Sequence, residues 1–584
     1  MGVFDKASLA LVPDGIKDGK LYSIKPTDGS GDFTFSRGSN LAATRVNENG
    51  LIEKGRENLV EFSNNFSTSK TPFGVTVSSG EAGYDGTNNA WKLIKSSSSG
   101  DYLRWTESGS LGAAVFTYSI YVKAGSLSYF VIWTTGGNQA YFELTGNGSV
   151  TYTQGSDLVD SKIESVGNGW YRCSLTASFN NSEVRFYPTT DGTPGVAGGT
   201  SGDFVYIQNF QAEYGLVATE YVDRVGYDAA YAGVLEDLPR IDYTGGTPSL
   251  LLEPSRTNLI TNGEYINVID WSVGNVTLEN NSITSPENQT NATKVTGTGG
   301  FSQRRIFESF SQVSGLDFTI SIFAKEDTEN LLFLRFYNTT DNVYANASFN
   351  LSTGAIASNS LGTAKIENYG NGWYRCILTG TPSTTTTTGG AYFNLTSDGN
   401  STSTTSLYLW GAQLEQASYP TSYIPTYGAT ATRGGDNINA DIGIAQVGSN
   451  LSSGTWFVDF MKTGQDGNNQ ALILTPLNNN DQQIRFHFDP NTNVRFRDAV
   501  HGYTTMGGSV SNTTSRTKIL VSVDSSAGIA KVFANGAQVG SNYTLGATPF
   551  QFSRILGYGN NFKLFSTIFF PEALSDAECI ALTT

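Results

Sequence analysis

The sequence KIESVGNGWYRC at residues 162–173 returns as KIENYGNGWYRC at residues 365–376. The two tryptophans, Trp170 and Trp373, are 373 − 170 = 203 residues apart, and nearly the same offset relates the flanking sequences. A period this long indicates a duplicated domain, because solenoid repeats have units of roughly 20–50 residues. Within each copy, Gly-Asn-Gly favours a hairpin turn, and the residues after it alternate as in a strand that enters a core. The phrase therefore predicts two copies of one β-domain.

The composition indicates several β-domains. A chain of 584 residues is too long for one hydrophobic core. Its 65 glycines, 12% aromatic residues and 15% charged residues are typical of strands joined by tight turns. Short alternating runs, such as 129–133 and 331–337, are separated by Gly, Asn and Ser clusters, as in two-sheet jelly rolls. The predicted fold class is all-β, with tandem antiparallel β-sandwich (jelly-roll) domains and an extended N-terminal segment.

The expected organisation has five parts. They are an N-terminal anchoring segment, a first repeat, a bridge, a second repeat and a final β-sandwich, at residues 1–56, 57–224, 225–255, 256–427 and 428–584. Near the end of the chain, Ser575 is followed three residues later by Glu578, the pattern of a capping box at the start of a helix.

The charge and the termini exclude some classes of partner. A net charge of −16 argues against nucleic acid, which is bound through clustered Lys and Arg. The sequence has no apolar run of ~18 residues to span a membrane, and we expect no signal peptide because its first residues lack that pattern.

Cys173, Cys376 and Cys579 are expected to be reduced, mostly buried thiols of a protein assembled in the cytosol.

Histidine-based catalysis is not expected. The chain has two histidines: His487 alternates with phenylalanines in a predicted strand, and His501 lies in a predicted loop. No nucleophile elbow, zinc-protease motif or phosphate loop is visible.

A glycosidase would need two facing carboxylates. Each repeat has two glutamates at equivalent positions: Glu164 in repeat one matches Glu367 in repeat two, and Glu213 matches Glu415. A repeated lysine or glutamine lies beside each of them, which favours fixed salt bridges or turn contacts. We expect no enzyme, no catalytic residue and no cofactor.

Metal binding is also not expected. Asp459 and Asp481 could supply oxygens to Ca²⁺, but no Asp-x-Asp-x-Asp spacing accompanies them, so solvated turn acids are favoured.

Exposed aromatic faces could stack on sugar rings. Trp170-Tyr171 and Trp373-Tyr374 are candidates, but neighbours in a strand face opposite sides and a cysteine expected to be buried follows each pair. We therefore favour packing roles for these residues, and apply the same caution to Trp410 and Trp456. The carbohydrate-contacting residues remain unassigned.

Two parts of the chain resemble known families. Most of 451–584 resembles the laminin-G/concanavalin-A-like lectin superfamily, through its segments 532–536, 552–557 and 573–578. The repeats resemble carbohydrate-binding-module-like jelly rolls common in bacteriophage structural proteins, through 167–172, 251–259 and 407–415. Residues 33–53 resemble the lead-in of such phage proteins, which normally runs directly into the phrase at 239–243. Because repeat one intervenes, we expect it to be an inserted module.

The resemblance implies a fibre-like or spike-like structural protein on a bacteriophage virion. It implies a homotrimer that binds other virion proteins through the N-terminal segment and host-surface glycans through its β-sandwiches. Linked weak sites could then gain ~10²–10⁴ in apparent affinity. Two alternatives stay open: an architectural virion component without sugar binding, and a secreted bacterial glycan-binding or glycan-active protein.

Overall fold

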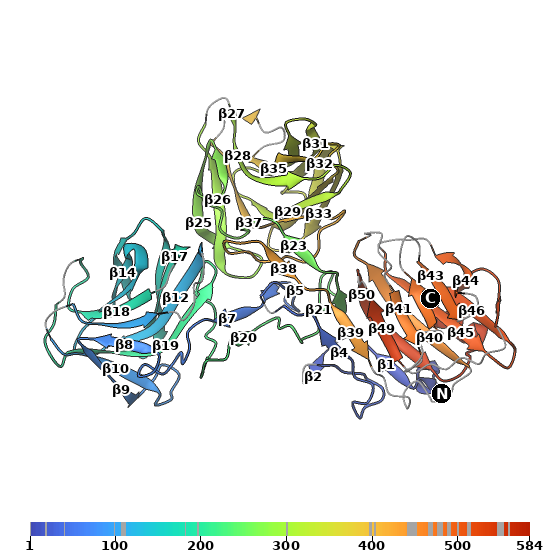
Figure 1. The fold of residues 1–584 in the computed structure, drawn as a ribbon, viewed down its shortest axis with the longest axis horizontal. Helices are drawn as coiled ribbons and strands as arrows, with labels where there is room; N and C mark the ends of the chain where they lie inside the picture. Colours follow the sequence, from blue (N-terminus) through green and yellow to red (C-terminus); the bar gives the residue numbers. More distant parts are fainter. Residues whose placement is uncertain are drawn as a thin grey trace.

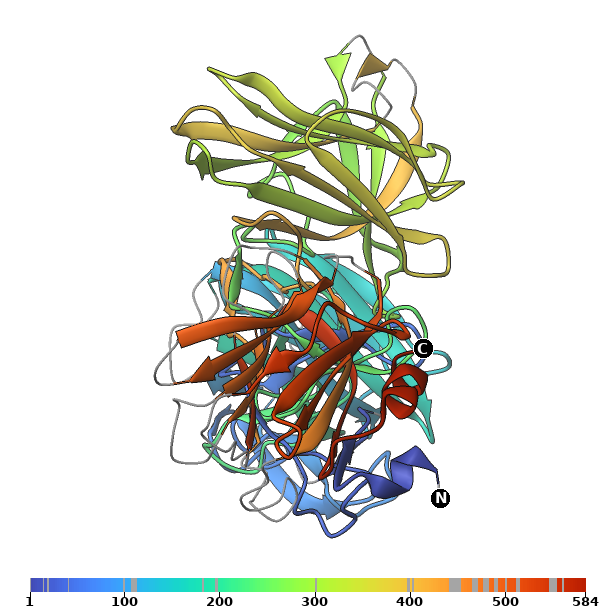
Figure 2. The ribbon, with the colours of Figure 1, turned by 90° about the vertical axis from the view of Figure 1, so that its right-hand side faces the viewer.

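The computed structural model forms three lobes, and both chain termini lie in the third (Figures 1 and 2). It describes residues 2–584 apart from 14, 18–19, 40, 98–99, 107–112, 181–182, 195–197, 300–301, 396–399, 402–403, 441–452, 465–470, 476–482, 488–491, 499–501, 511–514, 546–553 and 559–560. The all-β prediction is confirmed. No helix in the part of the chain that the structure describes is long and apolar enough to cross a membrane.

Repeat one is a sandwich of two antiparallel sheets, each with six described strands. The first sheet has the order β16(Leu158–Gly167), β17(Trp170–Asn180), β12(Ala113–Ala124), β19(Phe204–Tyr214), β10(Ala90–Lys95) and β9(Val75–Glu81). The second has the order β15(Ser149–Gln154), β14(Asn138–Glu143), β13(Tyr129–Thr134), β18(Glu183–Thr189), β11(Tyr102–Thr106) and β8(Lys70–Phe73). The short 3-10 helix η2(Thr135–Gly137) links β13 to β14.

Repeat two has the same strand topology, as the duplicated sequence predicts. Its first sheet has the order β33(Thr363–Asn368), β34(Trp373–Gly380), β29(Phe318–Glu326), β37(Ser406–Glu415), β26(Thr290–Gly297) and β25(Val276–Thr284). Its second has the order β32(Ala355–Leu361), β31(Asn342–Asn350), β30(Leu331–Asn338), β35(Thr386–Leu395), β28(Arg305–Gln312) and β24(Ser272–Gly274). A short pair, β27(Ser302–Gln303) and β36(Asn400–Ser401), lies outside both sheets.

The Gly-Asn-Gly phrase forms the same hairpin turn in both repeats. Asn168 and Asn371 have φ angles of 53° and 51°, in the left-handed region that asparagine tolerates better than most residues. The glycines on either side also have positive φ. The turns join β16 to β17 and β33 to β34, which confirms the predicted hairpins.

The third lobe is a sandwich of a nine-stranded and a seven-stranded sheet, counted over the described residues. The larger sheet contains β21(Ile241–Asp242), β22(Ser249–Leu252), β50(Phe562–Phe570), β40(Gly454–Lys462), β45(Thr517–Asp524), β46(Ile529–Ala534) and β47(Ala537–Gln538), with β1(Leu9–Leu11) paired to β50 and β48(Tyr543–Thr544) to β46. The smaller contains β4(Thr34–Ser36), β39(Asn437–Ala440), β49(Arg554–Tyr558), β41(Ala471–Thr475), β42(Gln483–His487), β43(Thr492–Asp498) and β44(Gly502–Val510). Helix α2(Asp576–Thr583) ends the chain, with the predicted Ser575–Glu578 capping box.

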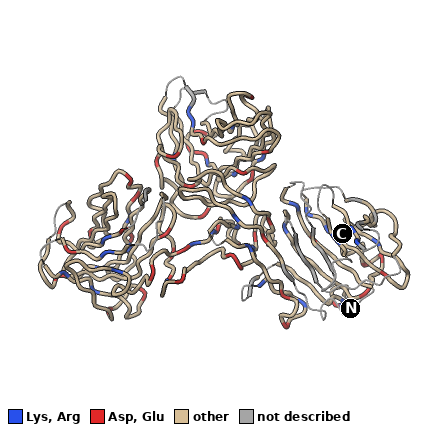
Figure 3. The backbone as a smooth tube through the Cα atoms, in the orientation of Figure 1, with Lys and Arg blue, Asp and Glu red and all other residues tan. Residues whose placement is uncertain are grey.

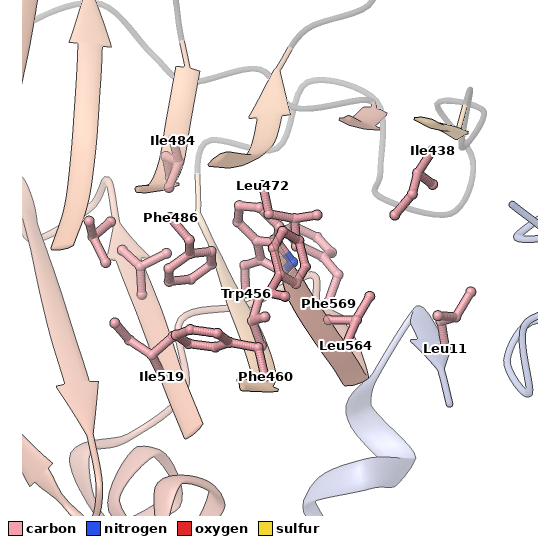
Figure 4. Packing of buried hydrophobic residues seen from close by; sticks show 14 of the residues in the cluster. Leu11, Ile438, Trp456, Phe460, Leu472, Ile484, Phe486, Ile519, Leu564 and Phe569 are labelled. Carbon is pink, nitrogen blue, oxygen red and sulfur yellow. The ribbon is translucent and has the colours of Figure 1, made fainter. Parts of the chain in front are cut away.

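Strand β1 of the N-terminal segment is part of this third lobe, so the segment is not separate from the final β-sandwich, whereas the sequence predicts a separate segment. Leu9 and Leu11 are fully buried and pack in one core with Leu252 and Trp456. Figure 4 shows Leu11 in this cluster with Leu564 and Phe569. The remaining short elements of the segment are η1(Val3–Lys6) and the hairpin of β2(Ile16–Lys17) and β3(Lys20–Leu21). Strands at 9–36 and 241–252 thus complete a sandwich that residues 428–584 do not form alone.

Both repeats are inserted into the third lobe through two-stranded necks. The hairpin of β5(Thr44–Val46) and β6(Ile52–Lys54) leads into the first neck, where β7(Arg56–Asn58) pairs with β20(Ala230–Ala232). In the second neck, β23(Arg256–Asn258) pairs with β38(Ala431–Arg433). After the first insertion the chain returns to lie beside β5. There the Val46 amide of β5 donates a hydrogen bond to the Asp242 carboxylate of β21 over 3.0 Å. This is the geometry that the predicted inserted module requires.

Candidate functional site

The repeated Trp-Tyr pairs are structural. Trp170 and Trp373 are 1% and 2% exposed, and Tyr171 points into the core of repeat one with Cys173. Trp170 lies on the opposite side of its strand, in a separate cluster that Tyr84 covers. The predicted packing roles are confirmed for Trp170, Trp373 and Tyr171, and Tyr374, which is half-buried, packs against the core of repeat two.

The other aromatic candidates are buried as well. Trp410 packs with Trp373 and Tyr423 under Ile52 of the β5–β6 hairpin, and Trp456 lies in the core of the third lobe. The contact of Ile52 shows that the β5–β6 hairpin covers part of the outer face of the first sheet of repeat two. The described His487 is 3% exposed in β42, whereas His501 and Asp481 lie outside the described residues.

The shared acids make the fixed contacts that the sequence favours. Glu164 pairs with Lys162, and Glu367 pairs with Lys365 at 2.7 Å. The second pair, Glu213 and Glu415, accepts hydrogen bonds from Gln211 (2.6 Å) and Gln413 (2.7 Å), and each glutamate also accepts the amide of a turn threonine.

Asp459 forms an ion pair with Arg516 at 2.7 Å instead of a solvated turn contact, which corrects that expectation. Its side chain is buried in β40, where Asp459 lies opposite Lys518 of β45. Among the described residues, no three His, Cys, Asp or Glu side chains come together as a possible metal site.

The second sheet of repeat one carries an open aromatic surface that sequence reasoning missed. On β11, β13 and β18 the outward positions include Tyr102, Arg104, Trp133, Arg185 and Tyr187, and all five are half-buried. They alternate with fully buried core residues, so the strand period sends them away from the core. We call these five residues the arginine–aromatic face of repeat one.

Cross-strand register places these side chains in rows. Arg104 lies opposite Arg185, which in turn lies opposite Trp133. The Arg185 guanidinium carbon is 4.2 Å from the Trp133 ring centroid and 4.8 Å from that of Tyr102. The Tyr102 and Tyr187 rings are 5.0 Å apart, and Tyr102 stacks on Phe73 at 4.8 Å. Cation–π contacts hold the rings and guanidinium groups in defined positions.

One carboxylate balances part of the positive charge. Glu183 pairs with Arg185 and lies 3.6 Å from Arg104. The pKa of Arg185 is raised: burial alone would lower it, but hydrogen bonds with Tyr187 and Glu183 outweigh that effect. Arg185 therefore stays charged while it lies against the rings.

Polar groups border the face on β14 and β15. Gln139 donates to Gln154 over 3.0 Å, and the Tyr152 hydroxyl donates to the same Gln154 oxygen over 3.0 Å. Tyr141 lies edge-on to Tyr152, at a centroid distance of 5.7 Å. A protein surface that can bind a carbohydrate combines rings for stacking with amides for hydrogen bonding.

A local sequence signal for this surface exists. Tyr102 and Arg104 are two residues apart, as are Arg185 and Tyr187, so arginine and tyrosine share one side of each strand. The alternation was visible in the sequence, but whether the outward side is open depends on the tertiary structure.

A second candidate lies where the lobes meet. Lys54 of β6 contacts two carboxylates of repeat two, Glu264 and Glu287, at 3.0 and 2.9 Å. Beside them is a small cavity of about 20 Å³, also lined by Glu213 of repeat one and Tyr427. Figure 3 shows basic and acidic segments together at this junction.

This ion cluster acts as a joint between lobes. Burial, together with Glu287, raises the pKa of Glu264 to about 7, although Lys54 opposes the shift. The Tyr427 hydroxyl also donates to Glu264 over 3.3 Å. Since both carboxylates are bound to the same lysine, the cluster fixes repeat two on the third lobe.

A further set of buried charges supports the second neck. Glu253 lies between Arg240 (2.9 Å) and Arg433 (3.0 Å), and Asp436 pairs with Arg240 and with Arg37. Burial alone would raise the pKa of Glu253, but the two arginines outweigh it and hold the value at about 2.

Comparisons with known proteins found distant structural likenesses. No family model and no curated protein matches the chain. The carbohydrate-binding module CBM40 of the Ruminococcus gnavus IT-sialidase, solved with α2,3-sialyllactose, is 16% identical and covers 23% of this chain and 84% of its own, with a TM-score of 0.20. The tandem CBM22 domains of Paenibacillus barcinonensis Xyn10C are 14% identical over 65% of this chain and 98% of their own, with a TM-score of 0.18.

The LG1-3 region of the laminin α2 chain is 10% identical over 82% of this chain and 96% of its own, with a TM-score of 0.15. With TM-scores this low, none of these likenesses identifies a ligand or a site in this chain.

Proposed function

We propose that the chain is a bacteriophage virion-surface protein that attaches to host glycans, and that the arginine–aromatic face of repeat one is one of its binding sites. The observation that supports the binding part is the contrast between two sets of aromatic residues. The framework tryptophans are buried, whereas Tyr102, Trp133 and Tyr187 remain accessible on one sheet. A contiguous surface of this kind on a folded domain favours a ligand.

The chemistry of the face suits a saccharide. Rings held by guanidinium contacts lose little conformational freedom on binding, so they can stack on the apolar faces of sugar rings at low entropic cost. Arg104, Gln139 and Glu183 border the rings and supply donors and acceptors for hydroxyl groups. Each site is weak in this proposal, and several linked copies gain affinity through effective concentration.

The virion part of the proposal rests on the sequence resemblance of residues 33–53 and 251–259 to phage structural proteins. Because strands at 9–36 lie in the third lobe, we place the contact with other virion proteins on the surface of that lobe. Phe4 and Ile24 are exposed there, at 60% and 47%. We retain a homotrimer as the proposed assembly and the virion surface as the proposed location, and we expect no catalysis.

A glycan array probed with the full chain tests the proposal. We expect Trp133→Ala to weaken binding about tenfold, the effect of losing one stacking ring. Tyr227→Ala, which removes a 70%-exposed ring on the first neck, serves as the matched control and should leave binding unchanged. Equal binding by the wild type and Trp133→Ala would remove this face as the site.

Proteomics of purified particles tests the virion part separately. The chain should be present in stoichiometric amounts, and its absence from particles would end that part of the proposal. Presence in particles together with a blank glycan array would leave a purely architectural role.

A further inference from the structure

A cleft of about 420 Å³ lies beside the β5–β6 hairpin, where β5 runs next to β21 of the third lobe (Figure 1). Its lining residues include Arg45, Asn47 and Glu53 of the hairpin and Ile241 and Tyr243 of the third lobe. A volume of this size is typical of sites for small ligands. The cleft shares no residue with the arginine–aromatic face of repeat one. We call it the hairpin cleft.

The walls of the hairpin cleft are fixed by contacts to two lobes. The Val46 amide donates to the Asp242 carboxylate, and the Tyr243 amide donates to the Val46 carbonyl, both over 3.0 Å. On the other strand of the hairpin, the Ile52 amide donates to the Pro286 carbonyl of repeat two over 3.0 Å. A ligand therefore meets walls that are already in place, which lowers the entropic cost of binding.

An ion pair between neighbouring strands faces the cleft. Arg45 lies opposite Glu53 in the register, and its Nε atom donates to the Glu53 carboxylate over 2.8 Å. The neighbouring residues Val46 and Ile52 are buried, as the alternation of side chains along a strand requires. The pair thus presents a donor and an acceptor side by side on the open side of the hairpin.

Both partners of this pair retain hydrogen-bonding capacity. Across the described residues, neither terminal guanidinium nitrogen of Arg45 and no second oxygen of Glu53 takes part in a hydrogen bond. A guanidinium group is a donor only and a carboxylate is an acceptor only. The pair can therefore hold a ligand group that both donates and accepts, as a hydroxyl group does.

Asn47 adds an oriented amide. Its Oδ1 atom accepts the amides of Asn49 (3.0 Å) and Leu51 (3.1 Å), which fixes the side chain in the hairpin turn. Because the oxygen is used in this way, the Nδ2 group is the part of the amide that can donate to a ligand.

The third lobe supplies the apolar part of the cleft. Tyr243 is half-buried, packs against the core of the third lobe and also lines the cleft. Ile241, which is 3% exposed, belongs to the same core and closes the base. The cleft thus combines an apolar wall with a polar one.

The charges of the lining residues favour an uncharged ligand. Arg45 is the one basic residue that lines the cleft, and Glu53 neutralises it, while Glu48 at the exposed tip of the hairpin is acidic. An anion would meet two carboxylates, and a cation would meet the guanidinium group at the centre of the polar wall.

We propose that the hairpin cleft binds a short uncharged saccharide. The hydroxyl groups of the sugar match the donors and acceptors of Arg45, Glu53 and Asn47, and hydrogen bonds to charged groups are stronger than neutral ones. The CH groups of the sugar ring contact Tyr243. The site lies outside repeat one, so the inference goes beyond the proposed function and does not depend on its binding face.

Titrations of the full chain with neutral sugars test the inference. The chain carries Trp133→Ala, so that the face of repeat one contributes little. The probes are the methyl glycosides of glucose, galactose, mannose and N-acetylglucosamine, together with lactose and cellobiose, and binding is measured by saturation-transfer difference NMR. We expect at least one probe to bind. Arg45→Ala should weaken that binding about tenfold or more, the effect of one hydrogen bond to a charged group, and Glu53→Gln should weaken it severalfold.

These variants should fold, and a matched control exists. The side chains of Arg45 and Glu53 are 24% and 33% exposed, and ion pairs at such positions contribute little to stability. Lys92→Ala removes the lysine of a similarly exposed pair with Glu81 (2.9 Å) in repeat one and should leave binding unchanged. Protection of the buried Cys579 thiol from labelling reports that the third lobe is folded.

The outcomes separate the two sites. Binding that Trp133→Ala leaves intact and Arg45→Ala removes would support the inference, whatever the result for repeat one. Binding by the wild type that Trp133→Ala abolishes would overturn the inference and leave the proposed function standing. Binding unchanged by Arg45→Ala, or no bound probe at all, would also overturn it. Binding of trilysine without any sugar would overturn it as well and assign the cleft to a basic peptide.

Discussion

The clearest consequence of the fold is that a residue near the N-terminus stabilises the C-terminal sandwich. Leu11 of β1 is fully buried, and its strand pairs with β50 more than 550 positions along the chain, with Leu11 opposite Thr567. Leu11→Ala would leave a cavity in the third lobe. Large-to-small substitutions of this kind cost about 2–5 kcal/mol, and a three-residue strand can relax around the cavity, so we expect about 3 kcal/mol. That free energy corresponds to about a 150-fold rise in the opening equilibrium of the third lobe.

The three cysteines give a local assay, because each lobe has one. Cys173, Cys376 and Cys579 are free thiols and fully buried, in repeat one, repeat two and the third lobe respectively. Burial raises the pKa of Cys579 to about 12, so it reacts slowly until its surroundings open. It packs in one cluster with Ala10, the neighbour of Leu11 on β1, so the loosening of β1 exposes it.

The labelling rate of each thiol is measured peptide by peptide by mass spectrometry. It reports the equilibrium constant for opening of the lobe that holds the thiol. In Leu11→Ala we expect the rate at Cys579 to rise about 150-fold while the rates at Cys173 and Cys376 stay at wild-type values. Leu103→Ala, an equal truncation in the core of repeat one, should accelerate Cys173 alone. An unchanged rate at Cys579, or equal acceleration of all three thiols, would refute the assignment of the N-terminal strand to the third lobe.

Three other predictions follow from the architecture. Residues 429–584 expressed alone should show no cooperative unfolding by circular dichroism, because they lack β1, β4, β21 and β22. Replacement of residues 59–229 by an Asn-Gly turn should leave Cys376 and Cys579 protected from labelling, because the ends of the deleted segment are paired in the first neck. Burial raises the pKa of Glu264 from its ordinary 4.5 to about 7, so the folded chain keeps a proton that the unfolded chain releases. Stability should therefore fall by as much as ~3 kcal/mol as the pH rises from 4.5 through 7, and Glu264→Gln should remove that part of the dependence in urea titrations at pH 5.5 and 8.5.

The framework of the repeats was predictable because its causes are local. Turn chemistry at Asn168 and Asn371 depends on adjacent glycines, and the opposite faces of Trp170 and Tyr171 follow from the period of a strand. Each of these features is decided within about ten residues of sequence.

The set of strands that make up the third lobe could not be predicted in this way. β1 is three residues long and buried on both sides: Leu9 and Leu11 face one cluster and Ala10 faces another. It therefore shows no alternation of polar and apolar residues. Its partner is β50, and no local pattern specifies a pairing across more than 550 positions.

The arginine–aromatic face of repeat one could not be predicted for a different reason. Each repeat has two sheets with outward-facing aromatic residues, and the sequence does not say which sheet another part of the chain will cover. Ile52 of the β5–β6 hairpin closes the outer side of Trp373 and Trp410, and Tyr84 closes that of Trp170. The rings that remain accessible are those on the second sheet.

The two copies share their framework and differ on the outer side of the second sheet. The residues of the turn and the buried tryptophan are the same in both repeats, where positive φ angles and burial restrict what can replace them. At the open face the constraint is weaker, since side chains on the solvent side contribute little to the core, and there Trp133 corresponds to Arg335, Arg185 to Tyr392 and Glu183 to Gly390.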